Sequence, residues 1–324
     1  MPESRARVTA LLTTYRPRFD YLEAALRSAL AQEEVAVEVL VSDSGSDDAV
    51  RDFVLGFGPQ VRYRRNATPQ NAAGNHRLAI AEVRSPYVAL LGHDDAWEPG
   101  FLAALVPPLD ADPHCVLAFS DHWFIDPAGK LDHALTEQMT AHWGRAARTT
   151  GVQHDMLTLL AAQTMPLAMA AVLRTEVAQA HPIPDASGPA YDIWLAYAMA
   201  VLGRPAWYDA RRLTQWRFHP AGGTSLGNPD WYAGGAFTWD AVLTDARCAP
   251  IHAIARQRGA TSWRSLARTL IRRGERPGEA RAALTRAASL APIPADRLLR
   301  AALALSPVAT TAAVRLFDAA RRVI

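Results

Sequence analysis

The sequence contains only two cysteines, a single lysine and no long apolar run. Cys115 and Cys248 fit neither the spacing of a zinc site nor a disulfide framework, which favours a reducing cytoplasm. No stretch reaches the roughly 18 apolar residues that a membrane-spanning helix needs. The apolar segment near the N-terminus is too short for a secretory signal. We therefore expect a cytoplasmic protein.

Several widespread catalytic signatures are also missing. The sequence has no Walker loop, no GxGxxG dinucleotide fingerprint and no nucleophile elbow. The eight histidines other than His93 and His219 form no recognisable spacing of metal ligands.

Charge is small overall but unevenly distributed. The 324 residues carry a net charge of +2, yet 14 arginines against four acidic residues after position 250 give that part +10. This split predicts an acidic functional body followed by a basic helical tail. The tail either covers the body with a solvated face or contacts an anionic membrane surface, a partner or the acceptor of the reaction.

Short apolar runs alternate with helical patterns in the first hundred residues. Strands are expected over 7–15, 35–43, 60–65 and 86–92, and helices over 21–32, 47–57, 71–83 and 99–109. Alternation at this pitch predicts an α/β fold with a doubly wound, mostly parallel sheet and helices on both faces.

The rest of the chain is less regular. We expect a strand with a turn over 115–130, a helix over 191–203, strands over 204–219 and a loop over 220–229. Residues 137–182 are ambiguous: a helix is expected first, then a loop, then "LAMAAVLR" (167–174) as either a strand or a helix. From residue 231 the pattern is helical throughout, which predicts an all-helical C-terminal extension.

Polar clusters follow three of the predicted strands. They are Thr13-Thr14-Tyr15, Asp43-Ser44-Gly45-Ser46 and His93-Asp94-Asp95. In doubly wound sheets ligands bind outside the carboxyl ends of the strands, so these clusters are candidate binding residues.

Each acidic residue in these clusters has two interpretations. Asp43 either holds a base or sugar, or caps the next helix, although Ser46 or Asp47 could provide that cap and leave Asp43 free. Adjacent Asp94 and Asp95 point opposite ways in an extended segment, so one could face a ligand while the other anchors the loop. A divalent cation such as Mg²⁺ is usually held by one or two carboxylates together with substrate.

Two later residues are also candidates. Asp192 opens the helix over 191–203, where it either interacts with the helix dipole or acts as a general base. His219 in "WRFHPAGG" is either an ordinary strand-end residue or a late metal ligand or phosphate contact.

Taken in order, these segments resemble the family 2 inverting glycosyltransferases of the GT-A fold. The segments that carry the resemblance include "VTALLTTYRPRFDYLEAALRSALAQ", "VEVLVSDSGSDD", "PYVALLGHDDAWEPGFL", "YDIWLAYAMAVLG" and "WRFHPAGGTS", between about residues 7 and 225. The resemblance implies a GT-A domain over 1–230, with a nucleotide-sugar half over 1–110 and an acceptor half over 111–230. The helical extension then covers 231–324.

The resemblance also implies roles for individual residues. Pro99 stands four residues after Asp95, as the proline of the family's metal signature does, and this assigns the metal contact to Asp94. The implied base is Asp192. The implied donor-binding residues are Thr13, Tyr15, Asp43, Asn75 and Asp94. The implied ligands of Mg²⁺ or Mn²⁺ are Asp94, Asp95 and His219.

Two positions depart from the family pattern. Gly92 stands where the metal signature usually begins with an aspartate, so His93 could take the place of the lost carboxylate. Ala190 stands where the family usually has its base. Either Asp192 has assumed that role, or the acceptor needs no base, or the enzyme is impaired.

The resemblance implies a bacterial-type hexosyltransferase that uses a UDP- or dTDP-sugar. Its acceptor would be a hydroxyl of a glycan, a lipid-linked saccharide or a natural product, and it would work in the cytoplasm, with peripheral contact at the inner face of the membrane. The alternatives are an impaired nucleotide-sugar-binding module and a transferase acting on a peptide. A nucleotidyltransferase would need a glycine- and base-rich loop after the first strand, where only Arg16 and Arg18 occur. We expect no nucleic-acid partner, and the oligomeric state stays open.

Overall fold

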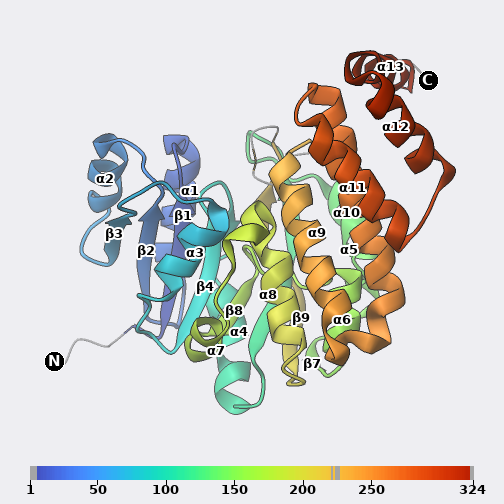
Figure 1. Ribbon diagram of the computed structural model, residues 1–324. Coiled ribbons are helices and arrows are strands. Elements are labelled where there is room, and N and C mark those ends of the chain that lie inside the picture. Colours follow the sequence, from blue (N-terminus) through green and yellow to red (C-terminus); the bar gives the residue numbers. More distant parts are fainter. Residues whose placement is uncertain (1–5, 220–221, 223–226, 322–324) are drawn as a thin grey trace. The chain divides into compact units, whose positions relative to one another are not determined.

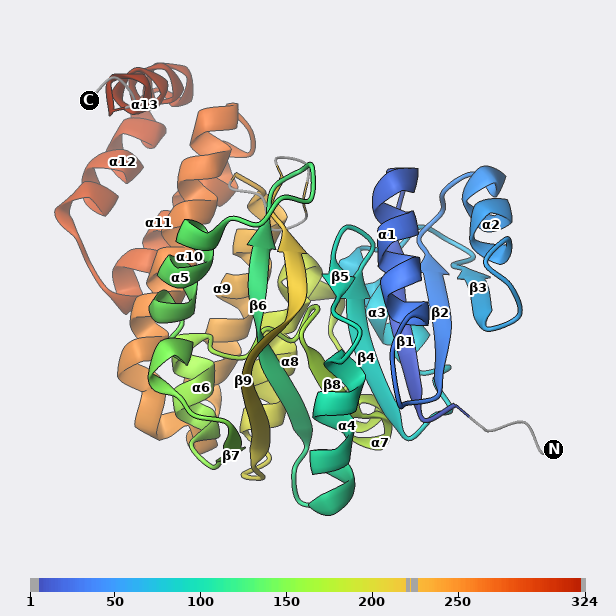
Figure 2. The same cartoon turned by 180° about the vertical axis from the view of Figure 1, so that it is seen from behind.

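The computed structural model describes residues 6–219, 222 and 227–321, with side chains as far as residue 314 (Figures 1 and 2). Contacts within the chain define two compact units. Unit 1 comprises Met1–Asp185 and Tyr191–Gly222, and unit 2 comprises Ala186–Ala190 and Gly223–Ile324. The domains predicted over 1–230 and 231–324 stay a prediction, and the loop expected over 220–229 lies mostly outside the described residues.

Unit 1 is built on a sheet that has nine strands in the described residues. Their order is β3-β2-β1-β4-β8-β6-β9-β5, and β7 pairs with β9. The strands are β1 (Val8–Thr14), β2 (Val37–Asp43), β3 (Val61–Arg65), β4 (Tyr87–Gly92), β5 (Ala96–Trp97), β6 (Leu117–Ile125), β7 (Gly151–Gln153), β8 (Ala171–Arg174) and β9 (Ala206–Arg217).

The long strand pairs of this sheet are parallel. Strand β1 pairs in parallel with β2 and β4, β2 with β3, and β6 with β9. The shorter strands β5, β7 and β8 run antiparallel to their neighbours. The mostly parallel sheet predicted from the sequence is therefore confirmed.

Helices cover both faces of the sheet (Figures 1 and 2). Those of unit 1 are α1 (Phe19–Leu30), α2 (Asp48–Leu55), α3 (Ala72–Ile80), α4 (Phe101–Ala111), α5 (His133–His142), α6 (Met156–Ala162), α7 (Thr175–Ala180) and α8 (Tyr191–Ala200). Figure 1 shows α3 and α8 in front of the sheet, and Figure 2 shows α1 and α4 in front of its other face.

Burial on both faces explains why the central strands are apolar without alternation. Val8, Ala10 and Leu12 of β1 join the core cluster formed with α1 and α4. Leu11 and Leu90 point to the opposite face and are also fully buried. Apart from Thr9 near its start, β1 is apolar until Thr13 and Thr14 at its carboxyl end.

Residues 137–182 resolve into short elements. This segment contains the end of α5, then β7, α6, β8 and α7, joined by turns. The strands expected over 204–219 are one continuous strand, β9, whose register against β6 shifts beside Asp121.

Unit 2 is helical. Its helices are α9 (Pro229–Thr244), α10 (His252–Arg273), α11 (Pro277–Leu290), α12 (Pro294–Leu305) and α13 (Pro307–Arg321). Helix α10 packs against α9, α11 and α13 around Leu266, Leu270, Leu284 and Leu303. The predicted helical extension is confirmed. Among the described residues, no helix has both the length and the hydropathy to cross a bilayer.

Candidate functional site

Three polar clusters meet at the carboxyl edge of the sheet. In the parallel ladders Thr13 lies opposite Gly92, and Thr14 lies opposite Asp43. The ends of β1, β2 and β4 are therefore level with one another. This is the edge at which sheets of this type bind ligands.

The predicted metal ligands Asp94 and His219 are in direct contact. His219 Nε2 donates a hydrogen bond to Asp94 Oδ2 over 2.9 Å, and both side chains are largely buried, at 11% and 18% exposed. Asp94 follows β4 and His219 follows β9, so the fold joins residues that are 125 positions apart. Their role as metal ligands stays a prediction.

The neighbouring carboxylate is held by Arg217, a residue that the sequence did not single out. Asp95 Oδ1 accepts a hydrogen bond of 2.9 Å from the backbone nitrogen of Arg217. The Arg217 side chain donates from Nε to the Asp94 carbonyl oxygen over 2.9 Å, and its guanidinium lies 4.4 Å from the centre of the Tyr21 ring. Arg217 lies two positions before His219, and alternate residues of an extended segment share one face. This spacing could have identified Arg217 as a site residue from the sequence.

Gly92 allows the two carboxylates to approach each other. A Cβ atom at this position would lie 2.6 Å from Asp95 Oδ2 and 2.8 Å from Asp94 Oδ1. One oxygen of each carboxylate therefore lies against the same backbone atom. Burial, and then the negative charge of Asp94, raises the pKa of Asp95 well above its usual range.

This donor set fits a hard divalent cation. Two carboxylates and an imidazole lie at one turn, and the pKa of Asp95 is raised first by burial and then by the negative charge of Asp94. Within the described ranges, no three His, Cys, Asp or Glu side chains are arranged to enclose a metal by themselves. Mg²⁺ sites with few protein ligands commonly complete their coordination with substrate oxygens and water.

Thr13 belongs to a second group of contacts beside this turn. His76 Nδ1 donates to the Ala72 carbonyl oxygen over 2.8 Å, because a carbonyl can only accept. His76 Nε2 is then the acceptor for the Thr13 hydroxyl at 3.2 Å. Burial lowers the pKa of His76 to about 4, so the ring stays neutral. It stacks on the ring of Tyr191 with a centroid distance of 3.9 Å.

Tyr191 links this group to the acidic residues. Burial, followed by the charges of Asp192, Asp95 and Asp94, raises the pKa of Tyr191 well above its usual range. All three carboxylates are therefore close enough to act on one phenol. His76 and Tyr191 were not among the predicted site residues, since only their packing in the fold relates them to the acids.

Asp192 has the features of a general base. Its Oδ1 is buried and has no hydrogen-bond partner among the residues that the structure describes. Burial raises the pKa of Asp192 to about 6. Backbone N–H groups at the start of α8 also interact with this carboxylate and lower its pKa in part. A carboxylate with one oxygen left without a partner and a pKa near neutrality is suited to accept a proton.

Ala190, at the position where the resemblance places the base, is buried among residues of unit 2. Ala190 is fully buried and ends a 3₁₀ segment, Asp185–Ala190. A Cβ on Gly234 of α9 would collide with the carbonyl oxygen of Ser187 and would lie 3.2 Å from Ala190 Cβ. A carboxylate at position 190 would therefore be buried against α9.

Asp43 is engaged in local hydrogen bonds, and the expectation that it is left free is wrong. Its oxygens accept from the Ser46 hydroxyl at 2.7 Å, the Ser46 nitrogen at 3.0 Å and the Tyr63 hydroxyl at 2.6 Å. Asp47 precedes α2 but makes no side-chain cap. Asp43 is fully buried and fixes the loop after β2. Donor binding by Asp43 stays a prediction.

Of the other two predicted donor-binding residues, Asn75 is buried and Tyr15 is exposed. Asn75 is buried, accepts from Ser42 Oγ at 2.5 Å and donates to the Ser42 carbonyl oxygen at 2.9 Å. It therefore ties α3 to the end of β2. Tyr15 is 50% exposed beside this edge, and its ring is accessible to a ligand.

A buried ion network supports β6 and β9. Asp121 accepts from Arg145 Nε at 2.5 Å, from Thr140 Oγ1 at 2.7 Å and from Arg212 Nε at 3.3 Å. Arg145 and Asp121 are almost completely buried. This network stabilises the second half of the sheet and is separate from the turn at Gly92.

Comparison with known proteins relates a segment of the chain, which includes Asp94 and Asp95, to one family. Residues 9–158 match the model of Glycosyl transferase family 2. Succinoglycan biosynthesis protein ExoO of Rhizobium meliloti (strain 1021) is 35% identical over 106 residues, which are 32% of this chain and 30% of that protein. ExoU of the same strain is 36% identical over 92 residues, 27% of this chain and 26% of that protein. The alignments thus span less than a third of these relatives.

Solved structures resemble the chain over a greater length. Residues 1–349 of S. aureus TarS in complex with UDP-GlcNAc match with a TM-score of 0.66 and 14% identity, over 98% of this chain and 92% of that one. Mannosyltransferase PcManGT from Pyrobaculum calidifontis in complex with GDP-Man and Mn²⁺ matches with a TM-score of 0.57 and 19% identity, over 98% and 89%. At these identities the likeness shows the fold, which is the predicted GT-A architecture. Through residues 9–158, which are less than half of its length, the chain is similar to glycosyl transferase family 2.

Proposed function

We propose that the protein is an inverting glycosyltransferase that moves a sugar from a nucleoside diphospho-sugar to an acceptor hydroxyl. One observation carries this proposal. Asp94 and Asp95 follow β4 at the carboxyl edge of the sheet, and His219 contacts Asp94 over 2.9 Å. Burial and then the charges of Asp192, Asp95 and Asp94 raise the pKa of Tyr191. The arrangement would provide acidic ligands for a cation and a separate carboxylate, Asp192, with one oxygen left for the acceptor.

The donor would bind across the ends of β1, β2 and β4. Tyr15 is exposed for stacking, the Thr13 hydroxyl is oriented by His76, and Asp43 and Asn75 hold the surrounding backbone. The donor that we propose is a UDP- or dTDP-sugar. Support for the class comes from the fold, since similar structures contain UDP-GlcNAc or GDP-Man.

Asp94, Asp95 and His219 would hold Mg²⁺ or Mn²⁺. When bound, the cation would neutralise negative charge developing on the leaving diphosphate. Arg217 holds Asp95 in place through its backbone nitrogen and the Asp94 carbonyl through its side chain. Mn²⁺ in the similar mannosyltransferase structure supports this assignment.

Asp192 would accept the proton of the acceptor hydroxyl. The hydroxyl oxygen then forms a bond to the anomeric carbon from the face opposite the diphosphate, and the bond from that carbon to the diphosphate oxygen breaks. The configuration is inverted, and the nucleoside diphosphate leaves. With a pKa of about 6, Asp192 is mostly ionised at pH 7 and ready to accept the proton.

The acceptor that we propose is a hydroxyl of a glycan, lipid-linked saccharide or natural product. The relatives named for succinoglycan biosynthesis support a glycan. We place the reaction in the cytoplasm, at the inner face of the membrane. A peptide acceptor is the alternative that an acceptor panel would reveal.

A binding module without turnover is the second candidate, since Gly92 and Ala190 replace two carboxylates of the family pattern. The test is release of nucleoside diphosphate from a panel of UDP-, dTDP- and GDP-sugars with Mn²⁺, with and without acceptors. Metal-dependent release that is lost in Asp94→Ala supports the enzyme. Tight nucleotide binding without release from any donor would support the binding module instead.

A further inference from the structure

Three arginines line a hollow between α11 and α12 in unit 2. The hollow has a volume of about 440 Å³, and its lining includes Arg281 from α11 and Arg297 and Arg300 from α12. Thr285 also lines it and accepts a hydrogen bond of 3.3 Å from Arg300. Three guanidinium groups around one hollow form a concentrated positive surface.

Neighbouring acids do not balance this charge. Glu279 is paired with Arg276 at 3.1 Å, and Asp296 is paired with Arg264 at 3.0 Å. Arg300 Nε is buried and lacks a hydrogen-bond partner among the described residues. The hollow therefore offers donors and positive charge to an anion, as phosphate groups require.

The same helix exposes large apolar side chains. Leu298 and Leu305 of α12 are 72% and 88% exposed, and they share one face because they lie two turns apart. Ala301 lies between them on this face and also lines the arginine hollow. Val308 at the start of α13 is 82% exposed. Apolar residues and arginines therefore lie on one continuous surface.

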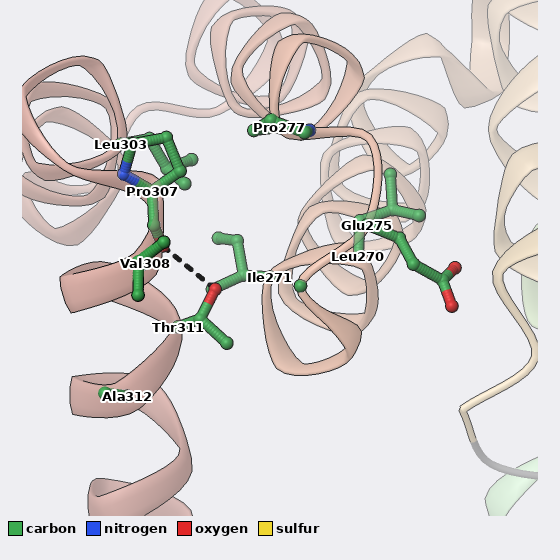
Figure 3. A pocket seen from close by; sticks show the side chains of 10 residues that line it. Leu270, Ile271, Glu275, Pro277, Leu303, Pro307, Val308, Thr311 and Ala312 are labelled. Atoms are coloured by element: carbon green, nitrogen blue, oxygen red, sulfur yellow. Dashed lines mark hydrogen bonds between the residues drawn. The ribbon is translucent and has the colours of Figure 1, made fainter.

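An apolar hollow adjoins this surface. It has a volume of about 310 Å³ at the junction of α10, α12 and α13. Figure 3 shows Leu303, Pro307 and Val308 on one side of it and Leu270 and Ile271 on the other. A polar ligand would gain little here, whereas part of a hydrocarbon chain would be buried.

We propose that this surface of α11–α13 binds an anionic phospholipid membrane. The arginines would contact headgroup phosphates, and Leu298, Leu305 and Val308 would enter the boundary with the acyl chains. The charge of +10 after residue 250 favours an anionic bilayer. An apolar face flanked by basic residues is typical of helices that lie in a membrane interface. A small phosphate ligand would leave the exposed leucines uncovered.

The test is co-sedimentation of the full chain with vesicles of phosphatidylcholine, with or without phosphatidylglycerol. Binding is expected only with phosphatidylglycerol. Arg281→Gln/Arg297→Gln is expected to lower the partition coefficient about 25-fold, from about 1 kcal/mol for each arginine. Leu298→Gln/Leu305→Gln is expected to lower it about tenfold. These side chains are exposed, so thermal unfolding should be unchanged.

Arg256→Gln/Arg268→Gln is the matched control, because both arginines are exposed on α10 and the loss of charge is equal. An equal loss of binding in this control would overturn the assignment to α11–α13. Absence of binding to phosphatidylglycerol vesicles would overturn the proposal that the protein binds an anionic membrane. Binding of inorganic phosphate with no effect of the leucine variant, or leucine-dependent self-association, would assign the surface to a small anion or to a second copy. None of these measurements requires glycosyl transfer, so they succeed or fail independently of the proposed function.

Discussion

At the residue scale, the turn from Gly92 to Asp95 depends on the fact that residue 92 is a glycine and has no Cβ atom. The backbone nitrogen of Asp95 donates to the Gly92 carbonyl oxygen over 3.2 Å, which brings both carboxylates back over the end of β4. A residue with a Cβ atom would occupy the space in which their oxygens now lie. Restoring the family's aspartate at this position is therefore not a neutral change.

We expect Gly92→Ala to weaken both stability and metal binding. The added methyl group must displace the two carboxylates, and overpacking of this kind costs about 1–3 kcal/mol. Thermal unfolding and Mn²⁺ titration measure the two effects. Gly100→Ala is the control, because no atom would lie within 4 Å of its new Cβ. An Asp at position 92 that increased both metal affinity and turnover would contradict this view of the turn.

Asp192 allows a prediction about catalysis. Asp192→Asn should lower kcat about 10²- to 10⁴-fold, the usual contribution of a general base. In the unchanged protein kcat should increase with pH through about 6, because only the ionised carboxylate accepts a proton. Asp185→Asn provides a control, since Asp185 is exposed and paired with Arg77. A pH profile that Asp192→Asn leaves unchanged would exclude Asp192 as the base.

The same substitution should stabilise the fold. The pKa of Asp192 is about 6 in the folded chain, above the value of 3.8 for a free side chain. Ionisation therefore costs folding free energy, and the loss develops as pH rises from about 4 to about 6. At pH 7, Asp192→Asn should raise the free energy of unfolding by roughly 1–3 kcal/mol. Chemical denaturation at pH 4 and pH 7 tests this sign, since the gain should appear only at the higher pH.

At the scale of elements, β6 and β9 are held together by the buried pair of Asp121 and Arg145. Arg145→Met should destabilise the protein by about 3–5 kcal/mol, because the buried Asp121 carboxylate would lose the positive charge that is paired with it. Asp121→Asn/Arg145→Met should recover part of that loss in urea unfolding. The control is Arg148→Met, whose partner Asp155 is 46% exposed, and its effect should stay below about 1 kcal/mol. Equal losses in both single variants would contradict the role of burial.

The elements that the sequence predicts are those with strong local patterns. Strands β1, β2 and β4 are apolar runs that end in polar residues, and their predicted limits lie within two residues of the observed ones. The segment 137–182 was predicted only as helix, loop and then a strand or helix over 167–174, because β7 and β8 are short and owe their conformation to pairing with β9, β4 and β6. Such pairing has no local signal.

In the candidate site, too, some residues were predicted from the sequence and others were missed. Asp94 and His219 were predicted as partners from family resemblance, and the fold brings them into contact. Arg217 was missed because its backbone nitrogen makes the contact with Asp95, and any residue type has that atom. Tyr191 was missed because its importance comes from the charges around it, which only the fold assembles.

At the scale of the whole molecule, ligand binding should be visible as stability. A ligand present at 100 times its Kd adds about 2.7 kcal/mol to the free energy of unfolding. We expect UDP or dTDP with Mn²⁺ to raise Tm by several degrees, and either component alone to raise it less. Asp94→Ala should remove the dependence on metal. Identical shifts with and without Mn²⁺ would contradict a cation at Asp94.

The short segment Ala186–Ala190 has a consequence for the molecule as a whole. The chain enters unit 2 at residue 186, returns to unit 1 at Tyr191, and leaves it again after Gly222. Gly234 of α9 accommodates this excursion, which ends two residues before Asp192. A chimera that exchanged only the C-terminal helices with a relative would set a foreign α9 against Ser187 and Ala190. An exchange of the helices should therefore include residues 186–190, and the residue proposed as the base follows this segment after one position.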